Sequence, residues 1–245
     1  MTTETTRVRR LAVGSALGVG GLFVGTVLPL VAILLVGAFV PLAFGELFAV
    51  GTLFFGVGLV LVSVWFVTST GRGLGYFDLR LPGLRDLLYV VGGLVALVGV
   101  AIAVGLVFSA LNVPTAQNSI ENTAREGGAE VLLWAIPLAW LAIGLGEELV
   151  FRGVVQNYLE EEFSTAGAIL ASSVIFALVH IPAYYSPNPA ATGSVLVVVF
   201  CLSVILGVTY VRTRNLLVPI LIHGTYNAIV FLSLYVALTG DVPGV

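Results

Sequence analysis

The sequence predicts an all-α, polytopic transmembrane helix bundle, and three observations lead to that fold class. Hydrophobic residues make up 59% of the 245 residues and charged residues only 9%, whereas a soluble domain carries about a quarter charged residues. Apolar segments of membrane-spanning length recur along the chain, and arginines collect on alternate sides of them. We expect a single integral membrane domain over residues 1–245.

Seven segments reach or approach the roughly 20 apolar residues that a spanning helix needs. They are 11–40, 47–68, 87–111, 131–156, 166–184, 195–211 and 216–238. The first is long and contains Pro29, so it is a tilted or kinked helix, or it splits in two and gives eight spans. The spans form an N-terminal group over 11–111 and a C-terminal core over 131–238.

The arginines predict the orientation of this bundle. If the N-terminus is cytoplasmic, the inner side collects Arg7, Arg9, Arg10, Arg72, Arg80, Arg85, Arg212 and Arg214. The outer side receives only Arg125, and Arg152 falls within a span. Since positive charge favours the cytoplasmic side, we expect a multi-pass cell-membrane protein with its C-terminus outside. The stretch 71–86 reads as an amphipathic segment on the inner surface, and 112–130 as a polar, mobile outer loop.

Three polar clusters interrupt the apolar spans of the C-terminal core. They are Glu147, Glu148 and Arg152 in GEELVFRG, Phe176 and His180 in FALVH, and His223 and Asn227 in HGTYN. An ionisable group within a span costs about 2.5 to 3.5 kcal/mol on insertion scales, and such residues usually mark functional sites. Both histidines of the protein belong to these clusters.

Helix spacing predicts that the three clusters meet at a similar depth. Glu147 comes 17 residues before Ser164 and His180 comes 16 after it, so a hairpin turning there brings them level. By the rise of about 1.5 Å per residue, Glu147 lies roughly 14 Å and His223 about 10 Å below the inner boundary. Glu148 and Arg152 are four residues apart, as are His223 and Asn227, so each pair shares a helix face.

These residue types permit two kinds of hydrolytic site. A buried glutamate beside a histidine can activate water, and a histidine with an asparagine can donate hydrogen bonds to an oxyanion. Alternatively, Glu147, His180 and His223 hold a divalent metal such as zinc. We favour the site without a cofactor, because no further carboxylate obviously orients each histidine ring. Interhelical hydrogen bonding is a third interpretation, and it fits the Glu148–Arg152 pair best.

The ordered motifs resemble EExxxR, FxxxH and HxxxN of the CAAX prenyl protease and bacteriocin-processing (CPBP, or ABI) family of intramembrane proteases. The resemblance covers roughly 134–231. It implies that Glu147 and His180 activate water, and that His223 and Asn227 form the oxyanion site or His223 binds a metal. It also implies that Glu148 and Arg152 support the first helix, with Glu148 sharing the catalytic role, and that Phe176 packs against the site.

The expected partners are therefore membrane lipid and a membrane-associated protein or peptide substrate, prenylated or not, and no nucleic acid. Two alternatives have other functions: a proton-coupled transporter that uses the same carboxylates and histidines, and a non-catalytic membrane scaffold or immunity protein. The sequence contains neither HExxH nor GxGD, the motifs of other intramembrane proteases, and it has no lysine to hold retinal.

Overall fold

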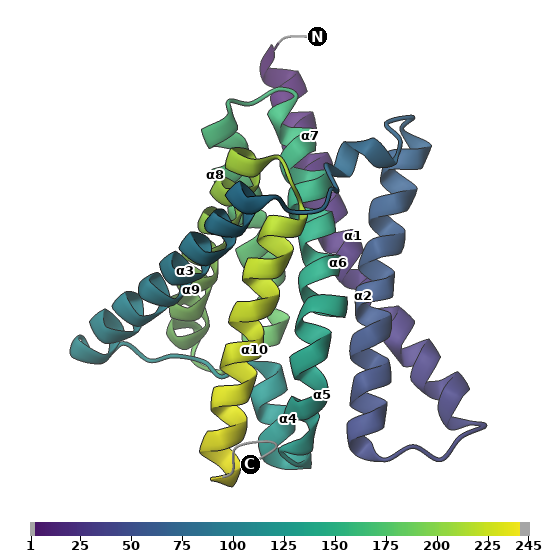
Figure 1. Cartoon of the computed structure of the whole chain (residues 1–245), viewed down its shortest axis with the longest axis vertical. Helices are drawn as coiled ribbons and strands as arrows, with labels where there is room; N and C mark the ends of the chain where they lie inside the picture. Colours follow the sequence, from purple (N-terminus) through teal and green to yellow (C-terminus); the bar gives the residue numbers. More distant parts are fainter. Residues whose placement is uncertain (1–2, 241–245) are drawn as a thin grey trace.

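Figure 1 shows the computed structural model of the chain, which describes residues 3–240. It is a bundle of helices, so the predicted fold class is confirmed. In the N-terminal part, α1 (Thr3–Gly37) and α2 (Phe44–Ser69) form an antiparallel pair, while α3 (Leu84–Ala110) leans away on the other side. A 3-10 turn, η1 (Leu74–Phe77), lies between α2 and α3.

The C-terminal part contains the remaining helices of the described chain. They are α4 (Ser119–Gly127), α5 (Glu130–Leu138), η2 (Ala139–Gly144), α6 (Leu145–Glu148), η3 (Leu149–Gln156), α7 (Asn157–Glu160), α8 (Thr165–Val179), η4 (Pro182–Tyr184), α9 (Pro189–Thr213) and α10 (Leu217–Thr239). From α5 to α7 the chain is one continuous helical rod, and α10 lies beside it (Figure 1).

Within residues 3–240, six helices are long and apolar enough to cross a membrane, and α8 is a shorter apolar helix. These seven correspond to the seven predicted segments. At about 1.5 Å per residue, the 15 residues of α8 extend only about 22 Å. The first segment does not split, because α1 continues through Pro29 as one helix.

The helices differ in how deeply they are buried within the protein. Half of the spanning window from α5 to α7 is buried, against 11% of the window in α3 and 17% of that in α1. The rod from α5 to α7 therefore forms the centre of the bundle, and the N-terminal helices present most of their surface to the surroundings.

Small residues allow α2 to approach this central rod closely. A Cβ atom at Gly56 of α2 would stand 2.6 Å from Cα of Ala142, and one at Gly146 would stand 2.9 Å from the Leu59 side chain. Such glycines let helix backbones pack at short range, as is common between membrane helices. The close approach fixes the part of the rod that carries Glu147.

One expectation about the loops was wrong. The stretch 112–130 contains α4, whose N-terminus is capped by Asn118, and α4 buries Ala124 in an apolar cluster. Its polar composition hid an apolar face in which Ile120 and Ala124 are one turn apart. In the stretch 71–86, Phe77 is buried in the main core while most of the other residues are exposed or half-buried, so its amphipathic character at the inner surface stays a prediction.

Candidate active site

Three helices bring the predicted polar residues together in the interior of the bundle. Glu147 and Glu148 lie on α6, His180 follows the last turn of α8, and His223 lies on α10. Glu147 and His223 are nearly buried, and Glu148 and Arg152 are fully buried. This confirms that the three clusters meet.

The helix that carries the two glutamates is irregular on both sides of them. The π-helical segment η2 precedes α6 and the π-helical segment η3 follows it. Between these two segments, regular α-helix is confined to the four residues of α6. Departures of this kind occur often at functional sites, because they change which way side chains point.

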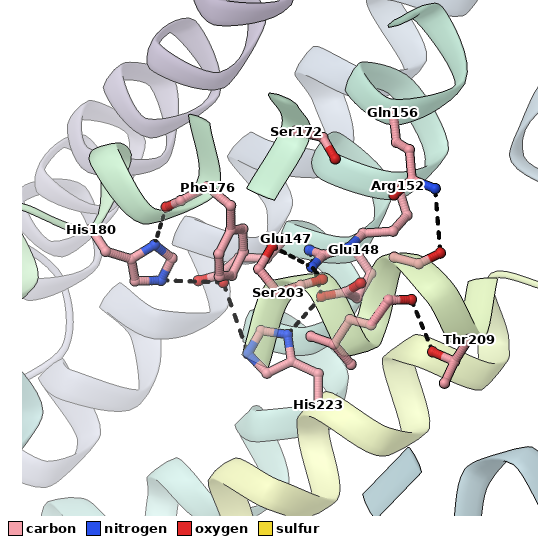
Figure 2. A network of polar contacts seen from close by, with 12 residues as sticks. Glu147, Glu148, Arg152, Gln156, Ser172, Phe176, His180, Ser203, Thr209 and His223 are labelled. Atoms are coloured by element: carbon pink, nitrogen blue, oxygen red, sulfur yellow. Dashed lines mark hydrogen bonds and ion pairs between the residues drawn. The ribbon is translucent and has the colours of Figure 1, made fainter. Parts of the chain in front are cut away.

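The carboxylate of Glu147 faces both histidine rings. Its Oε2 atom lies 3.6 Å from Nε2 of His180 and 3.9 Å from Nε2 of His223. In Figure 2 the two rings approach this carboxylate from different sides. Although Oε2 is buried, it has no hydrogen-bond partner among the described residues. It is a strong acceptor left available, which is costly unless the site uses it.

Glu148 joins two other charged or polar side chains through a single oxygen. Its Oε1 accepts hydrogen bonds from Nη1 of Arg152 at 3.1 Å and from Nδ1 of His223 at 2.8 Å. The sequence predicted the contact with Arg152 from the four-residue spacing. The contact with His223 was not predicted, and it supplies the carboxylate partner that the sequence did not reveal.

These contacts determine which nitrogen of each ring carries a proton. A carbonyl or carboxylate oxygen only accepts, so Nδ1 of His223 donates to Glu148. By the same reasoning, Nδ1 of His180 donates to the backbone carbonyl of Phe176 at 2.7 Å. Both rings therefore turn Nε2 toward Glu147, and in its neutral form each Nε2 is an acceptor.

Helix α9 holds the second terminal nitrogen of Arg152. Its Nη2 donates to the backbone carbonyl of Ser203 at 3.0 Å and to the hydroxyl of the same residue at 2.9 Å. Its guanidinium also lies over the Phe176 ring, 4.8 Å from the centroid. Phe176 in turn packs 4.4 Å from the His180 ring, centroid to centroid. The predicted packing role of Phe176 is thus matched by its position between the arginine and the histidine.

The backbone around His223 is fixed by Trp140. A Cβ atom at Gly224 would stand 2.4 Å from Cδ1 of Trp140. The indole nitrogen of Trp140 donates to the hydroxyl of Thr225 at 3.1 Å. Glycine at position 224 therefore allows α10 to pack tightly against η2 directly beside the histidine.

Asn227 is the one predicted residue that stays outside this network in the described part of the chain. It lies one turn after His223 on α10 and is half-buried. Tyr184 was not predicted, and its ring lies 6.4 Å from that of His180. Ser203 was missed as well, because a serine in an apolar helix is a common residue with no distinguishing spacing.

Among the described residues, no three His, Cys, Asp or Glu side chains are grouped so that they could hold a metal ion. Whether Glu147, His180 and His223 hold a divalent metal stays a prediction.

Comparison with known proteins gives one match. The family model described as type II CAAX prenyl endopeptidase Rce1-like matches residues 129–229. No curated protein and no solved structure matches the chain. The matched segment runs from the start of the central rod into α10, and it contains every residue of the cluster described above. The resemblance found in the three motifs is confirmed, since the segment that carries all three is similar to the Rce1-like type II CAAX prenyl endopeptidases.

Proposed function

We propose that this protein is an intramembrane endopeptidase that hydrolyses a peptide bond in a membrane-associated, CAAX-like protein or peptide. The observation that carries the proposal is the Glu147 carboxylate, which is buried, has no hydrogen-bond partner among the described residues, and faces Nε2 of two histidines. A carboxylate in this setting is suited to take a proton from water.

In the proposed reaction, a water molecule binds between Glu147 and His180. Oε2 of Glu147 and Nε2 of His180 are 3.6 Å apart, which is longer than a good hydrogen bond. Polar atoms at such a distance are often bridged by a water molecule. Glu147 takes one proton of this water, while Nε2 of His180 accepts a hydrogen bond from the other and fixes its orientation. The water oxygen then attacks the carbonyl carbon of the scissile peptide bond.

The attack converts the carbonyl oxygen into an oxyanion, which needs donors that are already in place. With a proton on Nε2, His223 is such a donor, and the hydrogen bond between its Nδ1 and Glu148 fixes the direction of the ring. The side-chain amide of Asn227, one turn further along α10, is the second proposed donor. Glu147 finally gives its proton to the leaving nitrogen as the C–N bond breaks, so that a carboxylic acid and an amine are released.

The roles of Glu148 and Arg152 follow from their contacts. Glu148 orients His223, and Arg152 holds Glu148 against α9 through Ser203. We assign the end of the bundle that carries the α1 N-terminus to the cytoplasm, because most arginines gather there. The site would then open to substrates whose C-terminal segment is held at the cytoplasmic surface.

The test is cleavage of a farnesylated peptide ending in a CAAX sequence, in liposomes that contain the purified protein, with products identified by mass spectrometry. Glu147→Gln keeps the size of the side chain and removes the base, and His180→Ala removes the orienting ring. Each should lower the rate by about 10²- to 10⁴-fold, the usual contribution of a general base. Arg125→Gln, in an exposed ion pair outside the site, is the matched control and should cleave normally.

Two further arms separate the alternatives. A chelator such as EDTA should leave the rate unchanged, whereas loss of activity that zinc restores would indicate a metal enzyme. The same peptide without its farnesyl group shows whether the lipid is required. Wild-type turnover by Glu147→Gln would refute the proposal. Proton flux that both substitutions abolish, without any cleavage, would favour a transporter instead.

A further inference from the structure

A second feature lies far from the catalytic cluster, at the end of the bundle where the N-terminus of α1 meets the C-terminal ends of α2 and α7 (Figure 1). A pocket of about 430 Å³ opens there, a volume within the range of small-molecule sites. It is lined by Thr6, Arg9, Arg10, Val13, Phe66, Thr70, Arg72 and Tyr158. Three arginines and two apolar side chains thus share one concave surface.

Two of the arginines are held in place by aromatic rings and a carboxylate. The guanidinium of Arg10 lies 4.2 Å from the centroid of the Tyr158 ring, and that of Arg72 lies 5.4 Å from the same ring. Both guanidinium groups also pair with the carboxylate of Glu161. Arginine side chains fixed in this way lose little further entropy when they bind a ligand.

The charges of this pocket are only partly compensated. Arg10 and Arg72 share the single carboxylate of Glu161. Arg9 is exposed and forms no ion pair with any residue in 3–240. Three guanidinium groups against one carboxylate leave two units of positive charge, which favours a ligand with negative charge.

The surroundings of the pocket indicate where that ligand comes from. Val13 and Phe66 line it, and next to its arginines Val8 is 62% and Leu11 37% exposed on α1. Exposed apolar residues beside arginines are typical of the boundary between lipid chains and headgroups. A free anion would use only the arginines, whereas a lipid would use the apolar side chains as well.

We propose that this pocket binds the phosphate of an anionic phospholipid headgroup, with the start of its acyl chains against Val13 and Phe66. The planar guanidinium group of Arg9 suits phosphate oxygens, which it can contact through two parallel hydrogen bonds. Arg72, whose Nε and Nη2 donate to Glu161, adds positive charge beside it. Occupation would link α1, α2 and α7 through one lipid. Since α7 ends the rod that carries Glu147, the lipid would also brace the catalytic helix.

The experiment is native mass spectrometry of the full-length protein in detergent, titrated with dioleoyl phosphatidylglycerol or dioleoyl phosphatidylcholine. These lipids share acyl chains and differ in net charge. The wild type should bind phosphatidylglycerol more tightly. Arg9→Gln should weaken that binding about fivefold, the effect expected for one arginine near a lipid surface, and should leave phosphatidylcholine binding unchanged. Arg125→Gln, at the opposite end of the bundle, should bind both lipids as the wild type does.

Arg72→Gln should weaken phosphatidylglycerol binding further, and a thermal unfolding curve shows whether that variant still folds. If Arg72→Gln does not fold, the lipid affinity of Arg9→Gln still tests the proposal, because Arg9 forms no ion pair among the described residues whose loss could unfold the protein. Equal affinity of wild type and Arg9→Gln for phosphatidylglycerol would overturn the proposal. Displacement of the lipid by millimolar inorganic phosphate would also overturn it, since it would show a site for free anions.

Discussion

Replacing Arg152 by methionine should reveal whether the buried ion pair is needed for folding, for activity, or for both. The substitution keeps a long, flexible side chain and removes the guanidinium. It leaves the carboxylate of Glu148 without the donor at 3.1 Å and the carbonyl of Ser203 without the donor at 3.0 Å. Both acceptors are in the bundle interior, where removing one member of a buried ion pair lowers the free energy of unfolding by about 3 to 5 kcal/mol.

The double variant Glu148→Met with Arg152→Met gives the matched comparison. Replacing both members of a buried pair by apolar residues of similar size is often neutral or stabilising. We therefore expect most of the lost stability to return, which a double-mutant cycle measures as a coupling energy. The double variant should nevertheless remain inactive, because His223 has lost the carboxylate that holds its Nδ1 at 2.8 Å.

The assay combines urea or thermal unfolding in a fixed detergent with the liposome cleavage measurement. We expect the double variant to regain stability and to remain inactive. That result would separate the role of the ion pair in folding from its role in orienting His223. An active double variant would refute the reasoning, since it would show that His223 does not depend on Glu148. A double variant as unstable as Arg152→Met would show that buried charge is not the cause of the destabilisation.

Two further predictions concern packing and pH. Gly224→Ala places a Cβ atom 2.4 Å from Cδ1 of Trp140. This overpacking should lower the free energy of unfolding by about 1 to 3 kcal/mol and also lower the cleavage rate. Adding Trp140→Leu to this variant should restore part of the lost stability. Glu161 gives the pH prediction: burial alone would raise its pKa, but hydrogen bonds from Arg72, Arg10 and Tyr76 outweigh that effect and hold the pKa below its ordinary value. Its stabilising effect is therefore complete above the unfolded pKa of about 4.3 and is lost as pH falls through the lower folded pKa. Unfolding curves between about pH 5 and pH 3 should show the wild type losing more stability than Glu161→Gln, and parallel curves for the two proteins would contradict this account.

The sequence predicted the fold class and the meeting of Glu147 with His180, because both depend on regular spacing. Membrane helices have a fixed rise per residue, so residues equally far from a hairpin turn come out level. The contact between Glu148 and His223 could not be found in this way. It depends on how α10 is rotated about its axis, which the packing of Gly224 against Trp140 determines. Likewise α4 was missed because its average polarity concealed one apolar face.

The shared oxygen of Glu148 explains why the motif needs two adjacent glutamates. A base needs an oxygen that faces the water it deprotonates, whereas a residue that orients a histidine needs an oxygen that is held in place, so two carboxylates divide these tasks. On α6 each glutamate has one buried oxygen without a partner among the described residues, but only Glu147 turns that oxygen toward Nε2 of both histidines, whereas Glu148 gives its other oxygen to Arg152 and His223. Adjacent residues on a helix point about 100° apart, which separates the two environments while keeping them on one turn. The arginine then belongs to the second glutamate by its four-residue spacing, so the order of charges in GEELVFRG follows from the two different tasks of its acids.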